Sequence, residues 1–76
     1  MNKIRKKDLV HGAYYKGRSR NASEARWDGD HNVFVHWRTK FGETYLDELR
    51  HPEDEQVYDV FVAYEKIDTP TKLIPL

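Results

Sequence analysis

The sequence predicts one mainly β domain of about five antiparallel strands with one short helical element. Apolar and polar residues alternate in short runs, most clearly in VFVHWRT at 33–39, and this period of two is typical of strands. Glycine turns separate the runs, with DGD at 28–30 and KFG at 40–42. The chain has 76 residues and no cysteine, so a small core without disulfides must depend largely on aromatic side chains.

The chain begins with a polar, aperiodic stretch at 1–8, which we expect to be a flexible basic arm ahead of a domain at 9–68. The first strand is expected at 13–18, where two tyrosines stand between glycines. A turn at 21–23 then leads to EARWD at 24–28, which places Ala25 and Trp27 on one side of a second strand.

The third strand presents two faces. Val33, Val35 and Trp37 share one of them, and we assign it to the core. The opposite face carries Phe34 and His36 together with Arg38. We expect this second face to be a surface that contacts a partner.

The segment at 44–50 is compatible with a helix or a strand, and we favour a short helix. In a helix Tyr45 and Leu49 stack at i,i+4 and Thr44 is a suitable N-cap, whereas a strand would mix Asp47 with these apolar side chains. The HP pair that follows ends a helix, because the residue before proline avoids helical backbone angles.

The last strand is expected within VYDVFVAYEKI at 57–67. Both of its faces are apolar near the middle, which is typical of a strand that is covered on both sides. The final segment, 69–76, is a tail with two prolines. Its Leu73, Ile74 and Leu76 either pack back on the domain or dock elsewhere.

Four pieces of this pattern, YYKG at 14–17, ARWDGD at 25–30, VFVHW at 33–37 and DELR at 47–50, resemble the SH3-like small barrels of the Tudor and Agenet type over residues 11–67. The chain is also similar to short proteins found in bacteria and their phages. The family's acidic turn residue is replaced by Lys40. The resemblance implies an aromatic cage for a methylated Lys or Arg, with candidate walls at Tyr14, Trp37, Phe41 and Tyr45. We favour a core role for these aromatic residues.

Charge is balanced overall but not along the chain. Residues 1–20 hold seven Lys or Arg and one Asp, whereas residues 43–59 hold seven Asp or Glu and one Arg. The favoured interpretation is that the two blocks attract each other across the fold, where exposed ion pairs contribute about 0–1 kcal/mol each. The alternative is that one block faces a charged partner.

The sequence carries no signature of an enzyme, a metal site or a cofactor. Its four histidines form no H-x-x-x-H pair, and there is no P-loop, G-x-G-x-x-G or G-x-S-x-G. No apolar run approaches the ~20 residues that cross a bilayer, and no apolar stretch follows the basic N-terminus. We therefore expect a cytoplasmic, non-enzymatic protein without a metal or a cofactor.

The predicted function is an interaction module that binds a protein or peptide partner. The predicted contact residues are Phe34, His36, Arg38, Tyr14, Phe41 and Tyr45. The alternative is a nucleic-acid-binding accessory protein, in which Lys and Arg near aromatic residues neutralise phosphates. Its residues would be Lys3, Arg5, Lys6, Lys7, Lys16, Arg18 and Arg20. A homodimer is a further alternative, because exposed strand edges invite pairing.

Overall fold

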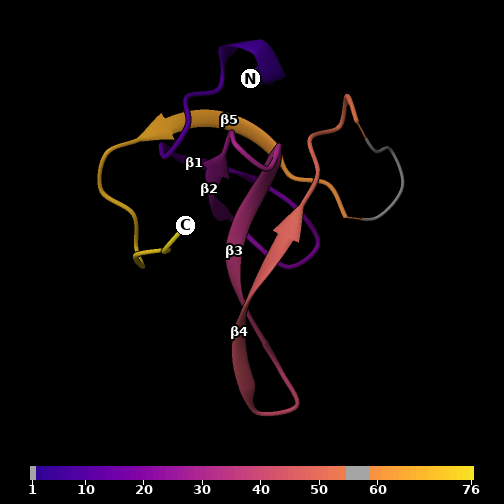
Figure 1. Ribbon diagram of the computed structural model, residues 1–76, viewed down its shortest axis with the longest axis vertical. Helices are drawn as coiled ribbons and strands as arrows, with labels where there is room; N and C mark the ends of the chain where they lie inside the picture. The colour runs from indigo at the N-terminus through magenta and orange to yellow at the C-terminus, as the bar shows by residue number, and fades with distance from the viewer. Residues whose placement is uncertain (1, 55–58) are drawn as a thin grey trace.

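The computed structural model describes residues 2–54 and 59–76 and confirms the mainly β fold. Five antiparallel strands form one sheet in the order β4-β3-β2-β1-β5 (Figure 1). The strands are β1 (Tyr14–Arg18), β2 (Glu24–Asp28), β3 (Val33–Lys40), β4 (Glu43–Leu49) and β5 (Val62–Ile67). Helix in the described residues is limited to one 3-10 turn, η1 (Lys6–Asp8), and none of it is long and apolar enough to cross a membrane.

The first four strands form a meander, and β5 returns to pair with β1. Beyond β4, Arg50 makes a parallel bridge with Val60, and the Phe61 amide donates to the Arg50 carbonyl at 2.9 Å. This bridge joins the end of one edge strand to the segment that leads into the other. The predicted final strand begins later than expected, at Val62, and residues 57 and 58 lie outside the described part of the chain.

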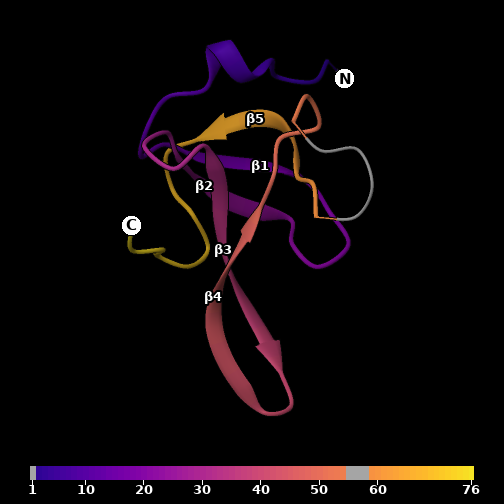
Figure 2. The same cartoon turned by 45° about the vertical axis from the view of Figure 1, so that its right-hand side comes forward.

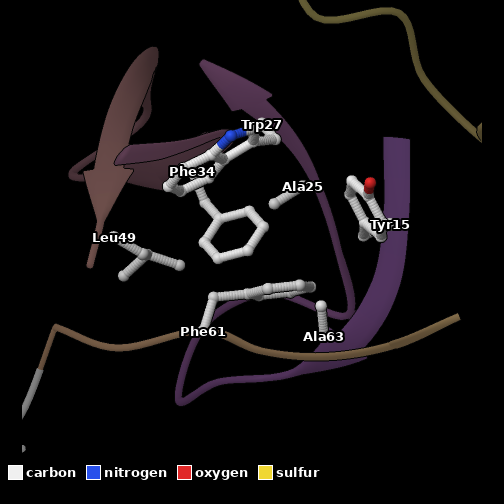
Figure 3. Packing of buried hydrophobic residues seen from close by; sticks show 7 residues of the cluster. All are labelled: Tyr15, Ala25, Trp27, Phe34, Leu49, Phe61 and Ala63. Carbon is white, nitrogen blue, oxygen red and sulfur yellow. The ribbon is translucent and has the colours of Figure 1, made fainter. Parts of the chain in front are cut away.

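Phe34 occupies the centre of the main core. Its ring centroid lies 4.8 Å from the rings of Trp27 and Phe61 and 6.3 Å from that of Tyr15. Figure 3 shows the Phe34 ring between Trp27 and Phe61. The main core consists of Tyr15, Ala25, Trp27, Phe34, Leu49, Phe61 and Ala63. Burial of an aromatic side chain contributes about 1.5–3 kcal/mol, so aromatic packing is the chief source of stability here.

The predicted assignment of the two faces of β3 is confirmed for one face and wrong for the other: Val33 and Val35 are buried as predicted, but the opposite face, expected to contact a partner, is buried at Phe34 and His36. Phe34 and His36 point into the main core and are 0% and 1% exposed, whereas Val33 and Val35 form a second, smaller core with Ile74 of the tail. The alternation itself is confirmed. Because the tail covers the Val33 side, both faces of the strand are buried.

The predicted short helix at 44–50 is also wrong, since residues 43–49 form β4. β4 pairs with β3 over seven residues, from Phe34 opposite Leu49 to Lys40 opposite Glu43. A helix of this length is marginal in water, because its nucleation cost is repaid only over many residues. The hairpin that Gly42 permits instead satisfies backbone groups along both strands.

Both chain ends pack on the sheet (Figure 2). The Ile4 amide donates to the Ala63 carbonyl at 2.8 Å, and the buried His51 ring donates to the Ile4 carbonyl at 3.0 Å. The segment expected to be a flexible arm at 1–8 thus contacts the sheet through Ile4 in this structure, while Met1 lies outside the described residues. At the other end the tail packs back on the domain, as one of the two alternatives predicted.

We expect Gly17→Ala to destabilise the fold, although the residue lies on an accessible strand. Gly17 follows a register shift in the β1–β5 pairing, and an added Cβ would lie 2.8 Å from the Phe61 ring and closer still to the Val62 carbonyl oxygen. Such overpacking costs about 1–3 kcal/mol. Urea unfolding measures this loss in the free energy of unfolding. Lys16→Ala is the neighbouring control, and equal stability of the two variants would contradict the close packing.

Candidate functional site

The end of the β3–β4 hairpin extends beyond the rest of the sheet. β3 pairs with β2 only at Val33–Val35 but pairs with β4 as far as Lys40. Residues 36–47 therefore form a projecting two-stranded arm, which we call the β3–β4 ribbon. Both Figure 1 and Figure 2 show the ribbon standing away from the other strands.

The tip of the ribbon is a two-residue turn with an aromatic side chain in an unfavourable backbone conformation. Phe41 has φ 53° and Gly42 has φ 79°, which is the pattern of a type I′ hairpin turn. Glycine adopts such angles at little cost, but for other residues this region costs about 1–2 kcal/mol. The Phe41 side chain is 93% exposed, so burial of the ring does not offset that cost.

The outer edge of the ribbon is acidic. β4 is the last strand in the sheet order, and its residues 43–49 include Glu43, Asp47 and Glu48 but no Lys or Arg. Tyr45 and Leu46 are each 39% exposed on the same strand. The edge therefore combines outward backbone groups, negative charge and partly exposed apolar surface.

The structure brings together only some of the predicted contact residues. Phe41 and Tyr45 lie exposed on the ribbon, and Arg38 lies there half-buried, with its guanidinium donating to Asp47 at 3.2 Å. Phe34 and His36 are buried, so the expectation that they form a contact surface is wrong. Tyr14 is half-buried beneath the C-terminal tail, away from the ribbon tip.

The proposed walls of an aromatic cage do not gather around one point. Three of the four rings instead each lie beside a cation: Tyr14 beside Arg26 at 5.1 Å, Trp37 beside Lys72 at 5.0 Å, and Phe41 beside Lys40 at 5.5 Å from the ring centroid. These distances are within the range of cation–π attraction.

The basic N-terminal residues meet the acidic block within the fold. Arg5 pairs with Glu53 at 3.0 Å and Lys6 pairs with Asp54 at 2.8 Å, so the favoured interpretation of the charge layout is confirmed for these pairs. The Arg5 hydrogen bond and the Lys6 amide lower the pKa of Glu53 to about 2. The Lys6 hydrogen bond likewise lowers the pKa of Asp54.

The remaining predicted nucleic-acid contacts are dispersed. Lys16 lies opposite Glu24 on β2 and Glu65 on β5, while Arg18 and Arg20 are exposed near the end of β1. Lys3 and Lys7 are exposed on the N-terminal segment. Arg5, Lys6 and Lys16 therefore all lie beside carboxylates.

His36 is a buried histidine with one unsatisfied nitrogen. Its Nδ1–H donates to the Trp37 carbonyl at 3.1 Å, and its Nε2 has no hydrogen-bond partner and lies 3.9 Å from the Asp47 carboxylate. Burial lowers the pKa of His36 below its ordinary value of 6.5, and this outweighs the attraction of Asp47. The ring is therefore neutral in the folded protein near pH 7.

Histidine and aspartate side chains gather at the turn between β2 and β3. Within residues 2–54 and 59–76, His11, Asp28 and Asp30 offer ligand atoms within 4.8 Å of one another, a donor set that Zn²⁺ accepts. Most of these atoms already make hydrogen bonds: Asp28 accepts from the His31 ring at 2.7 Å, and His11 Nδ1 accepts from the Gly29 amide at 2.9 Å. These hydrogen bonds therefore stabilise the turn between β2 and β3.

Asp28 remains ionised at this turn although it is largely buried. Burial raises the pKa of its carboxyl, but the hydrogen bonds from His31 outweigh that effect and hold the pKa below its ordinary value. The same contact raises the pKa of His31. Sequence reasoning missed that His11 joins this turn, although the density of Asp and His in DGDH at 28–31 was a usable signal.

No protein-family model, no curated protein and no solved structure matches this chain.

The buried His36 predicts a loss of stability on mild acidification. The pKa of His36 is lowered in the folded state, so on acidification the unfolded chain binds a proton at this ring before the folded chain does. The free energy of unfolding therefore falls as pH drops below 6.5. Urea unfolding between pH 7.5 and 5.5 should show a smaller slope for His36→Leu than for the unchanged protein. His31→Asn is the control of opposite sign, since His31 with its raised pKa stabilises the fold at low pH and loses that effect as pH rises. Equal slopes for the unchanged protein and His36→Leu would contradict a buried neutral ring.

The ion pair between Arg5 and Glu53 predicts a pKa change at the Glu53 carboxylate when Arg5 is replaced. Arg5→Gln should raise the pKa of Glu53 from about 2 toward its ordinary 4.5, because the Arg5 hydrogen bond is the largest cause of the lowering. NMR titration of the side-chain carboxyl carbon measures this, with Lys7→Gln as the control. A Glu53 pKa that is unchanged in Arg5→Gln would show that the N-terminal segment is not docked in solution.

Proposed function

We propose that this chain is a non-enzymatic interaction module that binds a protein partner through the β3–β4 ribbon. The observation that carries the proposal is Phe41, which is 93% exposed at the ribbon tip and has a positive φ of 53°. Strained backbone and exposed aromatic surface both cost stability, and sites with these features are characteristic of contact points. A partner pocket that accepts the ring offsets both costs.

The strand edge supports a particular kind of partner. β4 presents unpaired backbone groups beside Glu43 and Glu48, and an extended peptide adds to such an edge through main-chain hydrogen bonds. The negative charge favours a basic segment, because complementary potential speeds encounter and fixes the register. The partner is therefore a protein with an extended segment rich in Lys or Arg.

The strand order supports the resemblance to SH3-like small barrels, which stays part of this proposal. A four-strand meander whose fifth strand returns to the first, with a bridge between Arg50 and Val60, agrees with that architecture. Nucleic-acid binding receives less support, because Arg5 and Lys6 are paired with carboxylates and are less available to phosphates.

The test separates partner binding from folding by replacing Phe41 with asparagine, which the type I′ turn at this position favours. In Phe41→Asn the turn becomes Asn-Gly, so the hairpin should be as stable as before or more stable by about 1 kcal/mol. Loss of the ring should nevertheless weaken partner binding at least about tenfold. Thermal unfolding measures the change in stability of Phe41→Asn.

Binding is measured with peptides selected from a random phage-displayed library against the full chain. We expect enriched peptides with Lys or Arg at alternate positions, and weaker binding to Phe41→Asn and to Glu43→Gln/Glu48→Gln. Lys66→Asn, on exposed β5 surface, is the control that should bind normally. Equal affinity for all variants, or salt-sensitive binding of DNA in place of peptides, would refute the proposal.

A further inference from the structure

The C-terminal tail lies across the face of the sheet that is opposite the main core. Side chains from three adjacent strands form the floor there: Tyr14 is opposite Arg26, and Arg26 is opposite Val35. In Figures 1 and 2 the tail returns from β5 and runs beside β3. We call the surface beneath residues 71–74 the tail groove.

The tail groove hydrogen-bonds the main chain of the tail through the side chains of Tyr14, Arg26 and Trp37, and also through that of Glu24. The Ile74 amide donates to the Tyr14 hydroxyl at 2.8 Å, and that hydroxyl donates to the Ile74 carbonyl at 3.2 Å. Arg26 also donates to the Ile74 carbonyl, at 2.7 Å. One residue earlier, the Trp37 indole N–H donates to the Leu73 carbonyl at 2.7 Å. These groups recognise backbone, so any peptide in the same conformation offers the same partners.

Two side chains of the tail fit specific places. Ile74 is 4% exposed and packs against Val33 and Val35. Three residues earlier, the carboxylate of Glu24 accepts from the Thr71 amide at 2.9 Å and from the Thr71 hydroxyl at 2.8 Å. Leu73 between them is 77% exposed. The groove therefore recognises the pattern Thr-x-x-Ile.

The recognising groups are held in place by contacts that do not involve the tail. Arg26 donates through Nε to the Gly12 carbonyl at 2.8 Å, and its guanidinium lies 5.1 Å from the centre of the Tyr14 ring. A groove arranged in advance lowers the entropic cost of binding. A tail that only covered apolar surface would require Val33 and Val35 but not this set of directed hydrogen bonds.

We propose that the tail groove is a peptide-binding site that the chain's own tail occupies in cis, and that a partner peptide carrying Thr-x-x-Ile displaces it. A cleft of about 270 Å³ lies beside the tail and is lined by Ser23 and Trp37 together with Thr71 of the tail itself. Because a tethered tail is present at an effective concentration of about millimolar, the groove binds the partner strongly only when the tail is weakened. This site is separate from the ribbon tip, so either proposal can fail alone.

The experiment uses the full chain with Ile74→Asp, which removes the buried anchor from the tail, and a synthetic peptide with the sequence of residues 68–76. The chain has two tryptophans, so the Trp37 indole N–H signal in NMR reports the groove and that of Trp27 reports the main core. We expect Ile74→Asp to shift the Trp37 signal and leave Trp27 in place. Added peptide should return the Trp37 signal to its original position. The control is the same peptide with Val in place of Thr71 and Asp in place of Ile74, which should leave the Trp37 signal at its shifted position.

The affinity should depend on the groove residues. Glu24→Gln in the Ile74→Asp background should weaken peptide binding about tenfold, because it removes the charged acceptor of Thr71. If Ile74→Asp loses the Trp27 signal of the folded core, Thr71→Val serves as the milder variant with the same readouts. A folded variant whose Trp37 signal does not respond to the peptide would overturn the proposal. A concentration-dependent dimer of the unchanged chain, lost in Ile74→Asp, would also overturn it, in favour of tails exchanged between copies.

Discussion

The fold depends on the packing of one ring, that of Phe34. Its neighbours come from every part of the sheet: Tyr15 from β1, Trp27 from β2, His51 from the segment after β4, and Phe61 from the segment before β5. In a chain of 76 residues without cysteine, no covalent crosslink can replace these contacts. Phe34 therefore connects strands that are distant in sequence, and the two ends of the sheet meet around it.

A second constraint follows from the size of the chain. A small domain buries only about 60% of the surface that its unfolded chain exposes, so this five-stranded sheet would be poorly stabilised with one apolar face exposed. Here both terminal segments add cover. Ile4 of the N-terminal segment packs against the main core, and Ile74 of the tail packs against Val33 and Val35. The ends of this chain are consequently structural elements of the domain.

The two proposed contact surfaces lie where side chains are not needed for the two cores. The β3–β4 ribbon projects beyond β2 and carries the exposed Phe41 at its tip. The tail groove differs in kind, because Arg26 and Tyr14 are directed at main-chain atoms of Ile74. In the two proposals, the ribbon contacts a partner through an exposed side chain, whereas the groove binds a peptide in the place where the tail lies.

The sequence by itself determined the strands near residues 14–18, 24–28 and 33–40, because alternation and glycine turns are local properties of the chain. It also placed Phe41 and Tyr45 among the contact candidates that are in fact exposed. Local pattern could not decide which face of β3 is inward, since Phe34 on one side and Val33 with Val35 on the other are equally apolar. Only the tertiary structure decided it, because the cover for the second face comes from Ile74, far along the chain. The tertiary structure also decided that residues 43–49 form a strand, because β3 supplies the hydrogen bonds of β4. It likewise decided the position of the N-terminal segment, which forms ion pairs with the acidic residues 53 and 54.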